Sequence, residues 1–177
     1  MNTANKLTVF RIILVPFFVL FMLTQFTKYN QLIALIIFVV ASITDHFDGH
    51  IARKYNMITT FGKFMDPIAD KLLVSSALIC LTALGSIPAW AVIIIILREF
   101  AVSGLRLVAA ENGGVIAAAG WGKAKTAAQM TAIIMLLIPI PRLYPISMIV
   151  FYISVVLTVV SLVDFMLKNK AMLITDK

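Results

Sequence analysis

The sequence predicts an all-α integral membrane protein in which six transmembrane helices cross the bilayer and both termini are cytoplasmic. Hydrophobic residues make up 62% of the 177 residues and charged residues only 13%, whereas a soluble domain is typically about half apolar and a quarter charged. Apolar runs close to the ~20 residues that a helix needs to span the hydrocarbon also recur along the chain. We expect residues 1–177 to form a single membrane-embedded domain.

Six apolar segments are expected to form the spanning helices, and the breaks between them are polar or rich in Gly and Pro, which punctuate such chains. The segments are 7–26, 31–53, 67–84, 88–110, 123–140 and 145–167. The breaks fall at Lys28-Tyr29-Asn30, from Lys54 to Asp66, at Gly85-Ser86-Ile87-Pro88, from Glu111 to Gly122, and at Pro139-Ile140-Pro141-Arg142. Three aromatic residues near segment ends are typical of interfacial anchors, namely Trp90, Trp121 and Tyr144.

The distribution of basic residues favours a cytoplasmic N-terminus. Six spans place both termini on one side, and in this orientation 13 of the 15 lysines and arginines lie in or near the cytoplasmic half. Only Lys28 and Arg142 then face the other side, as the positive-inside rule requires. The net charge of +7 is explained by topology and anionic lipid headgroups, so no nucleic-acid partner is expected. We expect a multi-pass protein of the cell membrane.

Four aspartates, half of the acidic residues, fall within 26 positions. Asp45 and Asp48 end one predicted helix, and Asp66 and Asp70 begin the next. A carboxylate near the centre of a membrane helix costs about 2.5–3.5 kcal/mol, so a positive group is expected between them. Spacings of three and four place each pair on one helix face, and a short reversal brings the pairs to face each other. Such oxygen ligands suit Mg²⁺ or Mn²⁺, and two adjoining ions could hold a pyrophosphate.

An alternative is that these aspartates cap helix ends in the headgroup region and pair with neighbouring basic residues. Asp66-Pro67 resembles an N-cap followed by proline at the first helical position. That alternative accounts for Asp66 and explains the other three aspartates poorly. The basic residues available as partners are Arg53, Lys54, Lys63 and Lys71.

The complete spacing of this stretch resembles the signature of the CDP-alcohol phosphatidyltransferase family. It reads Asp45-x2-Asp48-Gly49-x2-Ala52-Arg53-x8-Gly62-x3-Asp66-x3-Asp70, and eight fixed residues over 26 positions make a chance match very rare. Further stretches are similar to the phosphatidylglycerophosphate synthase branch of that family, although Ala4 stands where the branch usually has proline. These are Asn5-Lys6-Leu7-Thr8 with Arg11, Arg98-Glu99-Phe100-x2-Ser103-Gly104-Leu105-Arg106, and Gly122-Lys123-x-Lys125-Thr126-x2-Gln129.

The resemblance implies a six-helix homodimer with a two-metal site, holding Mg²⁺ or Mn²⁺, that faces the cytoplasm. The donor would be CDP-diacylglycerol, the acceptor sn-glycerol 3-phosphate, and the products phosphatidylglycerol phosphate and CMP. Asp45, Asp48 and Asp66 would ligate metal, and Asp70 would act both as a ligand and as the general base. The residues implied for binding CDP-diacylglycerol are Thr8, Asp48, Gly49, Ala52, Arg53 and Gly62.

The acceptor phosphate needs a cationic site of its own, and four basic residues are available near the cytoplasmic ends of the predicted helices. Positive-inside topology alone is the competing explanation for their presence. They are Lys63, Arg106, Lys123 and Lys125.

Other interpretations of the sequence stay open. Within the family, the acceptor could be inositol phosphate, serine or phosphatidylglycerol. A cation carrier would also use intramembrane aspartates, but it would place them near the midplane on several helices. His46 and His50 have a spacing that can bind zinc, yet without a third ligand we expect them to be solvated. Arg98 and Glu99 could form a mutual structural pair, and Cys80 has no partner for a disulfide.

Overall fold

A computed structural model describes residues 3–54, 60–111 and 120–169 of the chain. Within these ranges, the side chains of 3–6, 45–54, 60–64, 66, 67, 70, 110 and 111 are not described. The described residues form six α-helices and one short 3-10 helix, which confirms the all-α class and the number of helices. The helices are α1 (Thr3–Leu23), α2 (Asn30–Lys54), α3 (Thr60–Ala83), α4 (Ala89–Glu111), α5 (Gly120–Leu137) and α6 (Tyr144–Lys168), with η1 (Pro141–Leu143) before α6.

Several helix ends differ from the predicted segments by three residues or more, among them both ends of α1, the start of α3 and both ends of α5. α5 ends at Leu137 rather than at residue 140, because Pro139 disfavours helical geometry at the residue before it and cannot continue the helix. α3 begins at Thr60, well before the predicted start at residue 67. Asp66 and Pro67 therefore lie within α3, and Asp66 is not its N-cap.

The turn between α3 and α4 closes with a Schellman motif at Gly85. The Gly85 amide donates to the Thr82 carbonyl, and the Ser86 amide donates to the Leu81 carbonyl, both at 2.9 Å. These bonds satisfy carbonyls that the helix end would leave unpaired. Gly85 has φ +70°, a conformation that costs glycine little because it has no Cβ.

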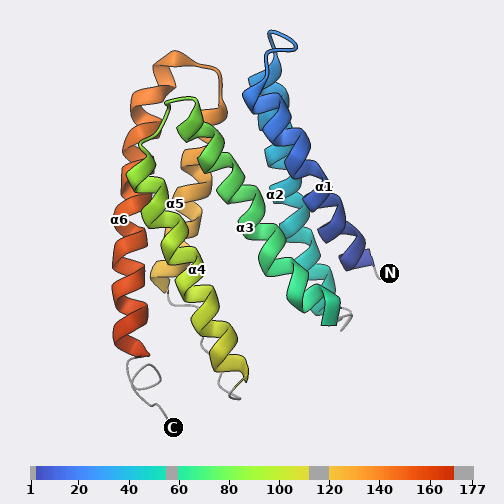
Figure 1. Cartoon of the computed structure of the whole chain (residues 1–177), viewed down its shortest axis with the longest axis vertical. Coiled ribbons are helices and arrows are strands. Elements are labelled where there is room, and N and C mark those ends of the chain that lie inside the picture. The colour runs from blue at the N-terminus through green and yellow to red at the C-terminus, as the bar shows by residue number, and fades with distance from the viewer. Residues whose placement is uncertain (1–2, 55–59, 112–119, 170–177) are drawn as a thin grey trace.

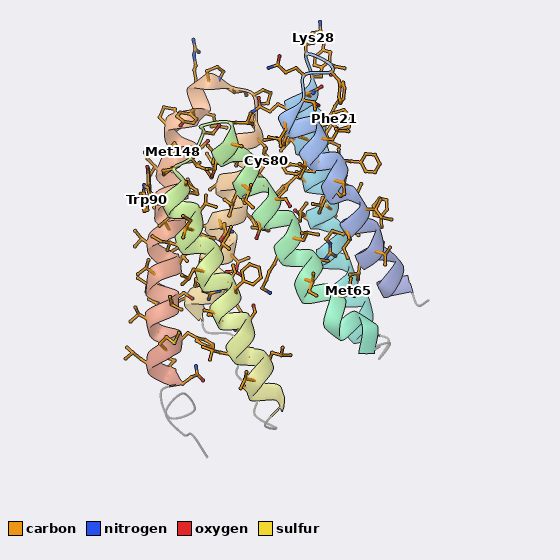
Figure 2. The ribbon with its side chains drawn as sticks, viewed as in Figure 1. Phe21, Lys28, Met65, Cys80, Trp90 and Met148 are labelled. Atoms are coloured by element: carbon orange, nitrogen blue, oxygen red, sulfur yellow. The ribbon has the colours of Figure 1, made fainter. Side chains whose placement is uncertain are left out.

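The six helices alternate in direction, so α1 begins and α6 ends at the same end of the bundle (Figure 1). The end of α2, the start of α3, the end of α4 and the start of α5 lie at this same end, which we call the motif end. α1 packs on α2 and α3, α5 packs most extensively on α6, and α2 and α3 both contact α5. In Figure 2, Lys28 lies at the opposite end and Met65 lies in α3 towards the motif end.

The outward faces of the helices carry large apolar side chains. Ile93, Phe100 and Val156 are each 62% exposed, whereas monomeric soluble proteins rarely expose such contiguous apolar surface. The interior includes an aromatic pair between α1 and α2, in which the rings of Phe18 and Phe38 lie 5.8 Å apart. This outer surface suits hydrocarbon rather than water.

Among the described residues, one segment is by itself long and apolar enough to cross a membrane, Pro141–Lys168. Shorter apolar helical stretches occur at Leu7–Leu23, Asn30–Thr44 and Lys71–Ala83. α4 and α5 contain charged residues well inside their ends, such as Glu99 and Lys125, and these shorten the uninterrupted apolar length. The expectation of six membrane crossings thus stays a proposal.

Small hydroxyl side chains line the face of α6 that packs against the bundle. Ser147, Ser154 and Thr158 are each 0% exposed, and Ser161 is 1% exposed. The Ser154 hydroxyl donates to the Phe151 carbonyl and the Thr158 hydroxyl donates to the Ser154 carbonyl, both at 2.7 Å. Because their protons are satisfied within α6, these side chains pack like small apolar groups and allow close approach, as is common between membrane helices.

We predict that Ser154→Leu destabilises the fold by about 1–3 kcal/mol, the usual cost of inserting extra methylene groups into a packed interior. The measurement is thermal unfolding of the protein in detergent micelles. Val156→Leu, on the outward face of the same helix, is the control and should leave the melting temperature nearly unchanged. Equal shifts for both variants would contradict close packing at Ser154.

Candidate active site

The four aspartates of the motif lie on two helices that meet at the motif end. Asp45 and Asp48 are in the last turns of α2, and Asp66 and Asp70 are in the first turns of α3. The two helices run antiparallel and contact each other. Because both stretches are helical, spacings of three and four put each pair on one side of its helix. The side chains of these aspartates lie outside the described part of the chain.

The residues predicted to bind the donor are distributed over the same two helices and α1. Thr8 is on α1, and its side chain is buried with 1% exposure. Arg11, one turn further along α1, is likewise 1% exposed. Its burial was not predicted, because in the sequence Arg11 stood out only as part of a motif and of the positive charge near the N-terminus. The structure gives only the helix positions of the other residues predicted to bind the donor: Gly49, Ala52 and Arg53 on α2, and Gly62 on α3.

The basic residues predicted to bind the acceptor phosphate have different environments. Arg106 is exposed on α4, and its guanidinium lies over the Phe165 ring of α6, 5.9 Å from the ring centroid. Lys123 is exposed on α5, whereas Lys125 is 2% exposed and faces the interior of the bundle. Among the three whose side chains the structure describes, Lys125 lines the interior cavity described below. The side chain of Lys63 is outside the described part.

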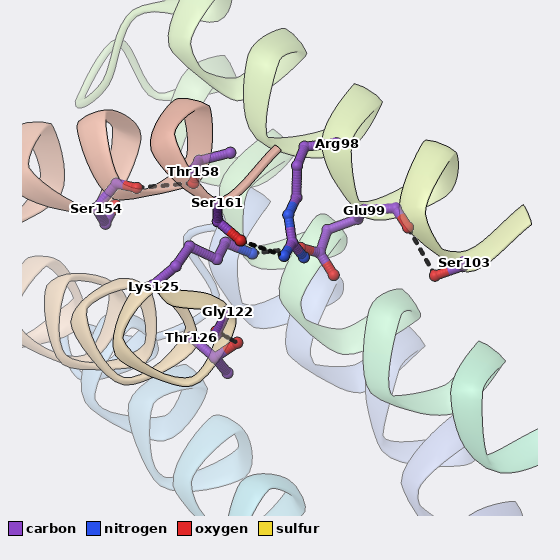
Figure 3. A network of polar contacts seen from close by, with 9 residues as sticks. All are labelled: Arg98, Glu99, Ser103, Gly122, Lys125, Thr126, Ser154, Thr158 and Ser161. Carbon is purple, nitrogen blue, oxygen red and sulfur yellow. Dashed lines mark hydrogen bonds and ion pairs between the residues drawn. The ribbon is translucent and has the colours of Figure 1, made fainter. Parts of the chain in front are cut away.

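Lys125 belongs to a buried polar network that ties three helices together (Figure 3). Glu99 Oε1 accepts Arg98 Nη1 at 3.0 Å and also accepts Lys125 Nζ. Arg98 Nη2 donates to Ser161 Oγ at 2.6 Å. The adjacent Arg98 and Glu99 therefore do pair, and the network extends from α4 to Lys125 on α5 and to Ser161 on α6. Buried charges of this kind persist only when they are paired.

A polar cavity of about 230 Å³ opens between α2, α3, α4 and α5. Lys71 directly follows Asp70 in sequence, and Ser42 precedes Asp45 by one helical turn, so the cavity adjoins both aspartate-bearing stretches. Its volume is below the usual range for drug-sized ligands, about 300–1,000 Å³. The lining residues are Ser42, Lys71, Val74, Ser75, Leu78, Ile95, Glu99, Lys125, Thr126, Gln129 and Met130.

A second cavity, of about 440 Å³, lies between α3 and α4 and is largely apolar. Leu72, Phe100 and Leu107 contribute to its walls. Lys71 and Ser75 line both cavities. The polar and the apolar cavity therefore meet at the same turn of α3, directly after Asp70.

The donor set of the aspartate motif fits a hard divalent cation. Four carboxylates supply only oxygen ligands, which is the coordination that Mg²⁺ and Mn²⁺ prefer. Among the side chains that the structure describes, no group of three or more His, Cys, Asp or Glu residues could hold a metal. The motif aspartates are the candidate metal ligands because of this donor chemistry and their grouping on two adjoining helix ends.

A polar cavity beside acidic helix ends, inside a bundle with an apolar exterior, is suited to an enzyme that handles phosphate compounds at a membrane. Comparison with known proteins specifies this class. The model of the CDP-alcohol phosphatidyltransferase family matches residues 1–160. The chain belongs to this family, which confirms the resemblance found in its motifs.

Curated relatives match the chain over nearly its whole length. A CDP-diacylglycerol–glycerol-3-phosphate 3-phosphatidyltransferase of Bacillus subtilis is 45% identical, with 95% of each chain covered. An enzyme of the same name from Haemophilus influenzae is 40% identical, with 99% of this chain and 97% of the relative covered. A probable phosphatidylglycerophosphate synthase of Mycobacterium tuberculosis is 42% identical, with 93% of this chain and 79% of the relative covered.

We predict that Glu99→Gln lowers the free energy of unfolding by about 3 kcal/mol, since removing one partner from a buried ion pair leaves its cations uncompensated. Thermal or denaturant unfolding in detergent measures this loss. Asp164→Asn makes the same chemical change in the ion pair of Asp164 with Lys168, whose side chain is 63% exposed. That control should cost less than about 1 kcal/mol, and equal costs would mean that the Glu99 network does not hold the helices together.

Proposed function

We propose that this protein transfers the phosphatidyl group of CDP-diacylglycerol to sn-glycerol 3-phosphate, giving phosphatidylglycerol phosphate and CMP. The observation that carries the proposal is the 45% identity, over 95% of both chains, to an enzyme named for this reaction. The motif aspartates on α2 and α3, at one end of the bundle and beside a polar cavity, support it. The reaction belongs to the biosynthesis of anionic phospholipids.

The metal site of the proposed enzyme consists of the four motif aspartates. Asp45, Asp48 and Asp66 would hold Mg²⁺ or Mn²⁺, and Asp70 would be both a ligand and the proton acceptor. Ions held there would supply positive charge to the diphosphate of the donor and to the departing CMP. The antiparallel arrangement of α2 and α3 supports this assignment because it brings the two helical stretches to the same end of the bundle.

The chemical step of the proposed reaction is a single displacement at phosphorus. Asp70 takes the proton of the primary hydroxyl of the acceptor, and the resulting oxygen attacks the phosphorus on the lipid side of the diphosphate. The bond from that phosphorus to the CMP oxygen breaks, and CMP leaves with the electron pair. The work of the protein is then to position the two substrates and to stabilise charge.

Each substrate has its own set of binding residues in this proposal. Gly49 and Ala52 leave room for the cytidine and phosphates of the donor, Arg53 presents a planar cation to its phosphates, and Gly62 permits a close approach. Thr8 on α1 and Asp48 on α2 complete this set. The acceptor phosphate is bound by Lys125 from within the polar cavity and by further basic residues around the motif end, Lys63, Arg106 and Lys123.

The proposed position of the protein in the membrane rests on its apolar outer surface and on the distribution of its basic residues. The six helices cross the cell membrane, with the motif end, both termini and the active site on the cytoplasmic side. The exposed apolar side chains of the outer faces support burial in lipid, and Lys28 and Arg142 at the opposite end from the motif agree with the positive-inside rule. The apolar cavity beside Asp70 suits the hydrocarbon part of a lipid donor. We infer a homodimer from the family resemblance alone.

An acceptor panel tests this function directly. Purified protein with CDP-diacylglycerol and Mg²⁺ should release CMP with sn-glycerol 3-phosphate, and much more slowly with inositol phosphate, serine or phosphatidylglycerol. Excess EDTA should abolish the release, and added Mg²⁺ or Mn²⁺ should restore it. Faster release with another acceptor would assign the chain to a different branch of the family. No release with any acceptor, together with cation flux across proteoliposomes, would favour a carrier.

Replacing the proposed base separates chemistry from binding. Asp70→Asn keeps the shape of the side chain but removes its ability to take a proton. Turnover should therefore fall by about 10²–10⁴-fold. Binding of CDP-diacylglycerol, measured by calorimetry in detergent, should persist. A variant that keeps more than about a tenth of the wild-type rate would exclude Asp70 as the base.

A further inference from the structure

Gln129 carries an unsatisfied hydrogen-bond acceptor in the wall of the polar cavity. Its side chain is 2% exposed, it lines the cavity, and its Oε1 atom is buried without a hydrogen-bond partner among the residues that the structure describes. Leaving such an atom unpaired is costly, because it has lost its hydrogen bonds to water and gained none in the protein. Because Gln129 lines the cavity, a hydrogen-bond donor bound there would give this acceptor a partner.

The rest of the lining shows which kind of donor fits. The Ser42 hydroxyl donates its proton to the Phe38 carbonyl at 2.8 Å, and Ser42 lines the cavity, so its oxygen is left to act as an acceptor. Glu99 is a carboxylate and also accepts. A ligand with O–H donors would pair with these acceptors. Lys71 and Lys125 also line the cavity, and their positive charge favours an anionic ligand. A small polyol phosphate combines both requirements.

We propose that Gln129 is a specificity-determining residue whose Oε1 accepts a hydrogen bond from the secondary, non-reacting hydroxyl of the acceptor. This inference rests on the proposed function, in which the acceptor is sn-glycerol 3-phosphate. The primary hydroxyl of that molecule reacts at Asp70, and the C2 hydroxyl remains to be recognised. The proposed base and Gln129 adjoin the same cavity, because Lys71 directly follows Asp70 in sequence and lines the cavity together with Gln129.

Recognition of this kind predicts selection against an acceptor that lacks the C2 hydroxyl. 3-Hydroxypropyl phosphate keeps the primary hydroxyl and the phosphate but cannot donate to Gln129. A site built around a hydrogen bond rejects such an analogue because its own polar group is then left unpaired. For one bond, we expect kcat/KM to be about 10- to 100-fold lower for the analogue than for sn-glycerol 3-phosphate.

The test is the ratio of kcat/KM for the two acceptors, measured by CMP release. Gln129→Met preserves the size of the side chain and removes the acceptor atom. It should lower kcat/KM for sn-glycerol 3-phosphate by about 10- to 100-fold and leave the value for 3-hydroxypropyl phosphate nearly unchanged, so that the ratio approaches one. Gln31→Met makes the same change on α2, where the Gln31 amide donates to the Leu136 carbonyl at 3.4 Å. This control should preserve the ratio.

Gln129→Glu provides a second variant that retains an oxygen acceptor. It should keep the preference for sn-glycerol 3-phosphate even if both rates fall, and it decides the question if the methionine variant does not fold. Equal losses with both acceptors in Gln129→Met, or loss of the preference in Gln129→Glu, would overturn the role of Gln129 while leaving the proposed function intact. Wild-type protein that releases no CMP with sn-glycerol 3-phosphate would instead reject the function, and this inference with it.

Discussion

The burial of Glu99 between two cations is the constraint on which the packing of α4, α5 and α6 depends. The Glu99 side chain is only 21% exposed, and a carboxylate so far removed from water needs positive partners. Arg98 and Lys125 supply them at the same oxygen. Arg98 in turn is held by Ser161 on α6. A Cβ at Gly122 would lie 3.4 Å from Arg98 Nη2, so α5 passes the guanidinium closely at this point. These contacts fix one wall of the polar cavity.

The molecule combines a hydrophobic interior with an apolar exterior, and it places several charged or polar side chains inside. Large apolar groups such as Ile93 and Phe100 cover its outside, whereas Arg11, Lys125 and Gln129 are almost fully buried. An enzyme that joins a lipid to a water-soluble phosphate needs this arrangement, since it must offer charge to one substrate while it remains embedded among the chains of the other. The hydroxyl-lined face of α6 contributes to the packing, because its small side chains allow neighbouring helices to approach closely.

Much of the fold could be predicted because the apolar runs and the Gly and Pro breaks follow directly from local chemistry. The predicted helix ends were less accurate where local signals compete. α3 starts at Thr60, before the Asp66-Pro67 pair that resembles a helix start. The motif aspartates could be assigned to two helices from spacing alone. The partnership of Glu99 with Lys125 could not, because the two residues are far apart in sequence and meet only when α4 packs near α5. Gln129 could be identified from the sequence as part of a motif. That its oxygen lacks a partner could not be predicted, because this depends on how the helices pack around it.

The polar and apolar cavities meet at Lys71 and Ser75, and this arrangement affects how substrates enter the site and how products leave it. In the proposed membrane arrangement, two reactants of opposite solubility would approach one turn of α3 from different surroundings, one from the aqueous phase and one from the bilayer. Neither then has to pass through the compartment of the other. The same separation applies to departure, so that a nucleotide can return to water while the lipid diffuses away laterally in its own leaflet.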